Sequence, residues 1–256
     1  SFFWSVVLLG VITVVYDVLG GIRAVMYSDV LQMIILVSVL VLVLVMLVSQ
    51  AGGMSAMLAS FPDERQAALD FAHHGLGDGH DFAFWPMLFG GLFLYVSYYG
   101  CDQSQVQREL SAKNVDTANQ ALLLNGLLRF PLVLLYCMVG VGIGVYAISQ
   151  PEFVTTLPAN DGAPNYNLAV PLYMIQQLPV GVVGLGLVAL FAAAMSSLDS
   201  VLNSLSATTM EDLIRRLRRR PLPERTEFLL AKALTVFWGT VTVAMAFFVD
   251  DIASSV

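Results

Sequence analysis

Long apolar runs limit this chain more than any other feature of its sequence. The segment "DVLQMIILVSVLVLVLVMLV", residues 29–48, has a single acidic residue, at its start. A helix of about 20 such residues crosses the roughly 30 Å hydrocarbon core of a bilayer. Lipid satisfies no backbone N–H or C=O group, so each span must be a helix or a strand of a closed barrel. The runs are too long for barrel strands and do not alternate, which predicts an all-α transmembrane protein.

The composition agrees, because only 12% of the residues are charged and 57% are apolar. A soluble domain is roughly 25% charged. We expect a single transmembrane domain over residues 1–256 with about six spanning helices. The sequence begins inside an apolar run and ends just past another, so we expect a fragment whose N- and C-terminal parts are missing. The expected spans are residues 2–19, 24–49, 84–107, 119–148, 178–210 and 226–249.

The basic residues gather on one side of the expected membrane. All but one of the twelve Lys and Arg residues lie in or beside alternate connections between spans, most densely in "RRLRRRPLPER" at 215–225. The other connections are acidic. By the positive-inside rule, we expect a multi-pass protein of the plasma or inner membrane, with cytoplasmic basic loops and both chain ends outside. The basic run is an orientation signal with lipid contact, and nothing in it indicates nucleic acid.

Polar residues interrupt the fifth expected span, in "AAAMSSLDSVLNS" at 192–204. On a helix, one stripe carries Ala193, Ser196, Ser197, Ser200 and Ser204. Close packing of another helix explains the small residues. It does not explain two neighbouring hydroxyls followed by Asp199. Hydroxyls and free carbonyls make an oxygen cage of low charge, which suits a monovalent cation.

Acidic residues inside spans are functional candidates by default. Asp29 lies about a turn into the second span, which holds no basic residue, so it needs a partner from another helix or a bound cation. Asp29 and Asp199 come from different spans and repel each other unless a cation lies between them. Asp17, close to the cytoplasmic surface, is expected to be solvated.

Two further groups of residues carry chemistry. Tyr95 and Tyr98 lie deeper than an interfacial aromatic belt, which favours a substrate wall. The spacing of the histidines in "HHGLGDGH" at 73–80 fits no standard ligand pattern, so a solvated loop is favoured and a metal site stays open. The sequence has no GxSxG, HExxH or Walker A motif, so we expect a protein that is not an enzyme.

Three segments together resemble the sodium:solute symporter family, whose members include sodium/glucose, proline, sialic acid and iodide cotransporters. They are "GGIRAVMYSDVLQ" at 20–32, "DQSQVQRELSAKN" at 102–114 and "LPVGVVGLGLVALFAAAMSSLDSVLNSLSATTMEDL" at 178–213. The resemblance implies a partial inverted-repeat core of the LeuT type, covering core helices four to nine, with binding at the midplane beside broken helices.

The resemblance also implies roles for individual residues. The main sodium ion is expected at the Ala193 carbonyl and the Ser196 and Ser197 hydroxyls. A second sodium site is expected at Asp29, Ser196, Asp199 and Ser200, although Asp199 departs from the hydroxyl residue typical there. The residues expected to contact or gate the substrate are Tyr98, Tyr95, Gln103 and Arg129.

The function implied is sodium-coupled import of a small polar or anionic solute by alternating access, with Na+ as the coupling ion. Two alternatives stay open at this point. One is a symporter-like sensor domain of a membrane signalling protein, and the other is a structural helical subunit with no sodium dependence. The sequence does not identify the solute, because one scaffold serves many substrates.

Overall fold

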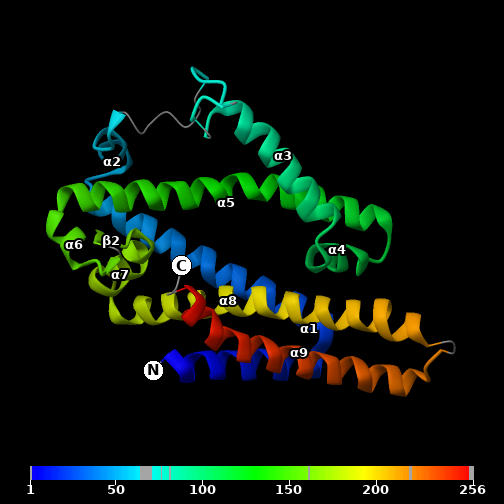
Figure 1. The fold of residues 1–256 in the computed structure, drawn as a ribbon. Coiled ribbons are helices and arrows are strands. Elements are labelled where there is room, and N and C mark those ends of the chain that lie inside the picture. Colours follow the sequence, from blue (N-terminus) through cyan, green and yellow to red (C-terminus); the bar gives the residue numbers. More distant parts are fainter. Residues whose placement is uncertain are drawn as a thin grey trace. The chain divides into compact units, whose positions relative to one another are not determined.

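The computed structural model describes residues 2–63, 71–75, 77–80, 82–160, 162–218 and 221–253, and these are almost entirely helical (Figure 1). The elements are α1 (Phe2–Gln50), α2 (Met54–Ala59), α3 (Phe84–Gly100), α4 (Gln103–Leu110), α5 (Val115–Ser149), α6 (Pro151–Thr156), β1 (Ala159–Asn160), β2 (Ala163–Pro164), η2 (Tyr166–Leu168), α7 (Ala169–Gln177), α8 (Val180–Thr208), the π-helical η3 (Thr209–Arg215) and α9 (Glu224–Ala253).

The chain divides into two compact units. Unit 1 contains residues 1–34, 102–111 and 189–256, and unit 2 contains residues 35–101 and 112–188. The long helices α1 and α8 therefore contribute one part to each unit. The polar stripe of α8 and the N-terminal part of α1 both belong to unit 1.

Unit 1 is built from the first part of α1, the short α4, most of α8, and α9. The N-terminal part of α1 packs closely on α9, because a Cβ atom added at Gly10 would lie 2.2 Å from a methyl carbon of Val243. Helix α9 also contacts the end of α8, where the Ser206 and Thr235 hydroxyl oxygens lie 3.1 Å apart. The N-terminal part of α1 and the end of α8 therefore both pack against α9.

Unit 2 has its core where the second part of α1 meets α5 and α7. A Cβ atom at Gly142 of α5 would lie 2.9 Å from Leu47 Cδ1, so the two helices approach closely here and a larger residue would require Leu47 to shift. The buried Tyr173 of α7 donates its hydroxyl to Gln50 Oε1 at 2.9 Å. Burial raises the pKa of Tyr173 to about 12. The two-residue strands pair antiparallel, with Ala159 opposite Pro164.

Five helical segments of the described residues are long and apolar enough to cross a membrane by length and composition. They are Phe3–Gly21, Val25–Gln50, Val115–Ser149, Val180–Arg215 and Glu224–Phe248. The expected span 84–107 corresponds instead to α3, of 17 residues, followed by α4. The break falls at Cys101 and Asp102, where the Asp102 carboxylate accepts from the Ser104 N–H at 2.8 Å and caps α4.

A single non-helical residue separates the two spans of α1. Gly21 has φ 59° and ψ −164°. This region of backbone conformation is essentially restricted to glycine. Helical geometry continues on both sides, so the chain changes direction without a loop.

Replacing Gly21 by alanine should therefore destabilise the protein by about 1–3 kcal/mol, because a Cβ strains this conformation. No heavy atom lies within 4 Å of the new Cβ, so the effect comes from the backbone alone. Thermal unfolding of the purified protein measures it. Gly126→Ala is the matched control, since Gly126 is helical and equally uncrowded, and it should be neutral or slightly stabilising. Equal melting temperatures for the two variants would contradict the assignment.

Candidate functional site

The polar stripe of α8 begins with two oxygens that converge. Ser197 Oγ donates to the Ala193 carbonyl oxygen at 3.3 Å, one turn back along the helix. Serine hydroxyls often bond this carbonyl in helices. Two oxygens this close can contact the same hard cation, whose oxygen ligands lie about 2.3–2.6 Å away. The Ser197 side chain is exposed in this chain, so the pair is open to an ion or to another helix.

Ser196 points to a different partner. Its hydroxyl donates to Asp29 Oδ1 at 2.6 Å, joining α8 to α1. The other carboxylate oxygen, Oδ2, accepts from Arg108 Nη2 of α4 at 2.6 Å. The same Arg108 nitrogen also donates to Ser200 Oγ. Asp29 thus obtains both a hydroxyl and a cationic partner from outside its own helix.

This arrangement brings together three of the four residues predicted for the second sodium site, with a guanidinium group among them. The Asp29 and Arg108 side chains are 17% and 29% exposed, so their ion pair is partly shielded from water. Such a pair is stronger than one on the open surface. The fourth predicted residue, Asp199, is fully buried; its carboxylate accepts from the Tyr16 hydroxyl of α1, and its Oδ1 lies 3.4 Å from the Ser200 hydroxyl.

Asp17 lies in the same region and does not behave as expected. The sequence predicted a solvated side chain, but Asp17 is only 3% exposed. Asn203 Nδ2 donates to Asp17 Oδ1 at 3.1 Å and also to the Asp199 backbone carbonyl at 2.9 Å. The expectation of a solvated Asp17 was wrong, because α8 covers the end of the first span and supplies a polar partner there.

The predicted substrate residues divide between the units. In unit 2, the Arg129 guanidinium carbon lies 4.7 Å from the centre of the Tyr95 ring, and Arg129 Nη1 donates to the Tyr99 hydroxyl at 2.8 Å. The Tyr98 ring meets the Tyr99 ring edge to face, with centroids 5.2 Å apart. Gln103 is exposed on the first turn of α4 and belongs to unit 1.

Tyr99 is the residue that sequence reasoning missed in this cluster. Its hydroxyl accepts from Arg129 and also from Asn125 Nδ2, at 2.8 Å in each case. Both donors lie on α5, one turn apart. The i, i+4 spacing of Asn125 and Arg129 was the available signal, but it does not say which of the neighbouring tyrosines they contact.

The histidine loop and the pocket at α9 lie outside the predicted sodium and substrate sets. The His73 and His80 rings stack with centroids 3.6 Å apart. The Gly75 N–H, which donates to Asp78 Oδ2 at 2.9 Å, holds the pKa of Asp78 below its usual value. Over the described residues, no group of three or more His, Cys, Asp or Glu side chains is placed to hold a metal ion.

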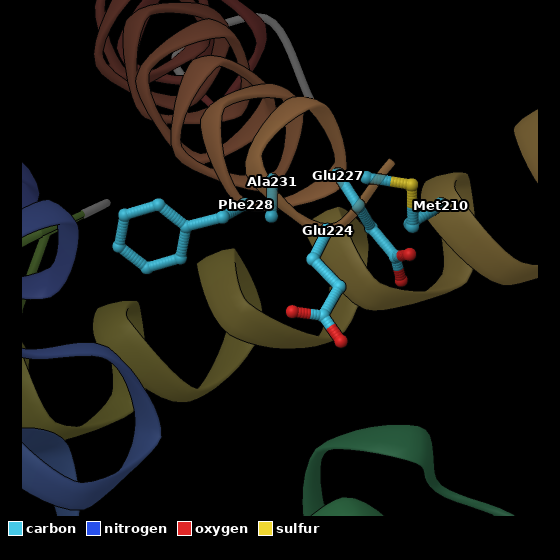
Figure 2. Close-up of a pocket in the computed structure, with 5 residues that line it drawn as sticks. All are labelled: Met210, Glu224, Glu227, Phe228 and Ala231. Carbon is cyan, nitrogen blue, oxygen red and sulfur yellow. The ribbon is translucent and has the colours of Figure 1, made fainter. Parts of the chain in front are cut away.

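A pocket of about 370 Å³ lies beside the start of α9 (Figure 2). Two glutamates of α9, Glu224 and Glu227, share its lining with Met210, Phe228 and Ala231. Arg215 donates to Glu227, and to Glu211 Oε1 at 2.6 Å. The acidic lining is thus tied to η3 by an ion pair, and no predicted site residue lines the pocket.

Comparison with known proteins assigns this chain to a family. The model of the sodium:solute symporter family matches residues 1–254. This chain belongs to that family. The family comprises transporters rather than enzymes, so the family, the helical symporter core and the non-enzymatic class predicted from the sequence are confirmed.

Individual relatives of this symporter-family chain are sodium-coupled transporters. The sodium/sialic acid symporter NanT of Aliivibrio fischeri is 31% identical over 91% of this chain and 45% of its own length. Human sodium-coupled monocarboxylate transporter 1 is 32% identical over 94% of this chain and 39% of its own length. Neither description names a sensor or a structural subunit.

A solved structure shares the fold with a TM-score of 0.80 and 26% identity. The match covers 95% of this chain and 49% of the chain in the solved structure. That structure is described as a substrate-bound outward-open state of a Na+-coupled sialic acid symporter with a novel Na+ site. This chain thus spans about half or less of the length of these relatives. The match of a partial symporter core supports a multi-pass membrane protein.

Proposed function

We propose that this chain works as part of a sodium-coupled secondary active symporter that imports a small polar or anionic solute by alternating access. The observation that carries the proposal is the convergence of Ser197 Oγ and the Ala193 carbonyl, 3.3 Å apart, in a chain of the sodium:solute symporter family. Helix positions that expose a hydroxyl beside a carbonyl offer neutral oxygens, which suit a monovalent ion that must also leave.

The main sodium ion binds at Ala193, Ser196 and Ser197 in this proposal. Ser197 and Ala193 supply two oxygens that already face each other. Ser196 bonds to Asp29 in the structure, so its hydroxyl brings the negative charge of Asp29 close to the ion. The membrane potential contributes about 2.3 kcal/mol per charge per 100 mV to inward movement of the ion.

A second sodium site at Asp29, Ser196, Asp199 and Ser200 is also proposed, with Arg108 as its competitor. The Arg108 guanidinium contacts Asp29 and Ser200 directly, so an ion that enters there displaces it. An ion that binds one arrangement of α4 better than another shifts the equilibrium between them. Sodium binding is thereby coupled to the position of the short helix α4.

The solute is proposed to meet Tyr95, Tyr98, Gln103 and Arg129. The Arg129 side chain is held by Tyr99 and lies over the Tyr95 ring, which fixes the direction of its guanidinium group. A fixed guanidinium group favours carboxylate and other polar oxygens. This favours an anionic or hydroxyl-rich solute over an apolar one.

Tyr99→Phe tests the support given to Arg129. Loss of the hydroxyl leaves two donors, on Arg129 and Asn125, without their acceptor, so the solute concentration for half-maximal uptake should rise about tenfold. The sodium concentration for half-maximal uptake should stay unchanged. Tyr136→Phe, which removes an exposed hydroxyl on the same helix as Arg129, should change neither value. An effect of Tyr99→Phe on sodium alone would show that the tyrosine serves the ion site.

The sidedness is proposed from the charge of the connections. Loops rich in Arg and Lys lie in the cytoplasm, and residues 1 and 256 lie outside, in the plasma or inner membrane. The proposed partners are sodium, the solute and the lipid bilayer, without nucleic acid. Labelling of residues 71–80 by a membrane-impermeant reagent in whole cells tests the orientation, since this connection should react without permeabilisation.

Uptake by the intact protein in proteoliposomes tests the function itself. An inward sodium gradient should drive accumulation of at least one labelled solute from a panel of sugars, amino acids, monocarboxylates and sialic acid. An equal potassium gradient is the control and should drive none. Uptake that is the same in sodium and in potassium for every solute would rule the proposal out.

A further inference from the structure

We propose that Asp17 and Asp199, termed the acid pair, form with Asn203 a cation site for a sodium ion that is separate from the serine pair Ser196–Ser197. The acid pair connects the N-terminal part of α1 with α8 inside unit 1. It shares Asp199 with the proposed second sodium site but uses neither Asp29 nor Ser200. The inference does not require that the serine pair bind an ion.

Both carboxylates of the acid pair are buried. Asp17 is 3% exposed and Asp199 is 0% exposed, in a chain whose helices have the length and composition of membrane spans. A carboxylate removed from water is costly unless it is paired with positive charge or is fully hydrogen-bonded. Two such groups on facing helices increase the cost through their mutual repulsion.

The partners of the acid pair do not provide the missing charge. Asp199 accepts from the Tyr16 hydroxyl and lies 3.4 Å from the Ser200 hydroxyl, and Asp17 Oδ1 accepts from the Asn203 amide at 3.1 Å. All three of these groups are neutral. Arg108, a cation in this network, instead donates to Asp29 and Ser200. One guanidinium group therefore serves a region that holds three buried or partly buried carboxylates.

One oxygen of the pair has no hydrogen-bond partner within the described part of the chain. Asp17 Oδ2 is buried and, among the described residues, no hydrogen-bond donor contacts it. The other oxygen of this carboxylate accepts from Asn203, which also donates to the Asp199 backbone carbonyl at 2.9 Å. These two bonds hold the Asp17 side chain beside the turn of α8 that contains Asp199. An unpartnered carboxylate oxygen that is held in this way can coordinate a cation.

The available ligands favour sodium. They are all oxygen atoms, from two carboxylates, the Tyr16 hydroxyl and the Asn203 amide, which excludes soft metals. Hydrogen bonds from Tyr16 and Asn203 already occupy one oxygen of each carboxylate, which leaves fewer free oxygens than the six to eight that calcium requires. Sodium needs fewer ligands, and it is the ion that gives the family of this chain its name.

Equilibrium binding of ²²Na+ to the intact purified protein, without solute, tests the proposal. Asp17→Asn should lose one bound sodium ion per protein relative to wild type. Asp212→Asn, the same change at an exposed position on η3, should lose none. Ser197→Ala should retain the ion at the acid pair, and the double variant Ser197→Ala, Asp17→Asn should lose it.

An unchanged sodium count in Asp17→Asn rules the proposal out, including where the pH dependence of uptake shifts, because the pair then holds a proton. If Asp17→Asn does not fold, sodium binding to Ser197→Ala is the deciding measurement. Absence of saturable sodium binding in that variant also rules the acid pair out as a sodium site. A residual ion that is lost with Asp29→Asn but kept with Asp17→Asn sits at the other site. Unchanged binding in Ser197→Ala contradicts only the serine-pair proposal.

Discussion

Replacing Ser197 by alanine in the intact protein is expected to raise the sodium concentration for half-maximal uptake at least about tenfold, which corresponds to about 1.4 kcal/mol of lost binding. The Ser197 hydroxyl is one of two oxygens that already converge on α8, and its loss leaves the Ala193 carbonyl alone. A cation that gives up water needs every ligand that replaces it. Uptake of labelled solute across a series of sodium concentrations measures the change.

Ser204→Ala is the matched control for this prediction. Ser204 lies on the same helix, and its hydroxyl donates to the Ser200 carbonyl at 2.7 Å, again one turn back. It therefore loses the same kind of bond outside the predicted ligand set. Its sodium dependence should stay close to that of wild type. Equal sodium dependence of the two variants would show that the Ser197 hydroxyl only packs against its helix.

Arg108→Ala is expected to make the stability of the protein strongly dependent on sodium. Without the guanidinium group, Asp29 loses its ion-pair partner in a partly buried position, and the protein should be destabilised by about 1–3 kcal/mol in sodium-free buffer. Sodium is then free to take the place next to Asp29 and Ser200. An ion present at about 100 times its dissociation constant restores about 2.7 kcal/mol.

Thermal unfolding in sodium chloride and in potassium chloride of equal ionic strength measures this effect. The melting temperature of Arg108→Ala should rise more with sodium than that of wild type. Arg215→Ala is the control, because Arg215 also pairs with glutamates, but at an exposed position away from the predicted ligands. It should respond equally to both salts. Equal melting temperatures of Arg108→Ala in the two salts would contradict competition between Arg108 and sodium.

The sequence predicted the family, the helical class and the stripe on α8, because these depend on local pattern. The stripe follows from helical spacing alone, and Ser196 does meet Asp29, as their shared place in the expected second site implied. The need of Asp29 for an external partner was also foreseen. Its identity was not, because Arg108 lies 79 residues away and reaches Asp29 only through the position of α4.

Tertiary contacts explain the other differences. Asp17 was expected in water because it lies near the end of a span, but Asn203, 186 residues away, covers it. The break between α3 and α4 had a local signal, since Asp102 followed by Ser104 is a typical helix cap. That signal was weaker than the apolar pattern on its N-terminal side. Hydropathy finds apolar segments but does not locate interruptions of one or two residues.

A high-resolution map of the intact protein in saturating sodium chloride tests the central claim most directly. The account predicts a density peak within about 2.3–2.6 Å of both Ser197 Oγ and the Ala193 carbonyl oxygen. This peak should disappear when choline replaces sodium. A map in which the Ser197 hydroxyl turns away and apolar side chains fill that position in both salts would contradict it.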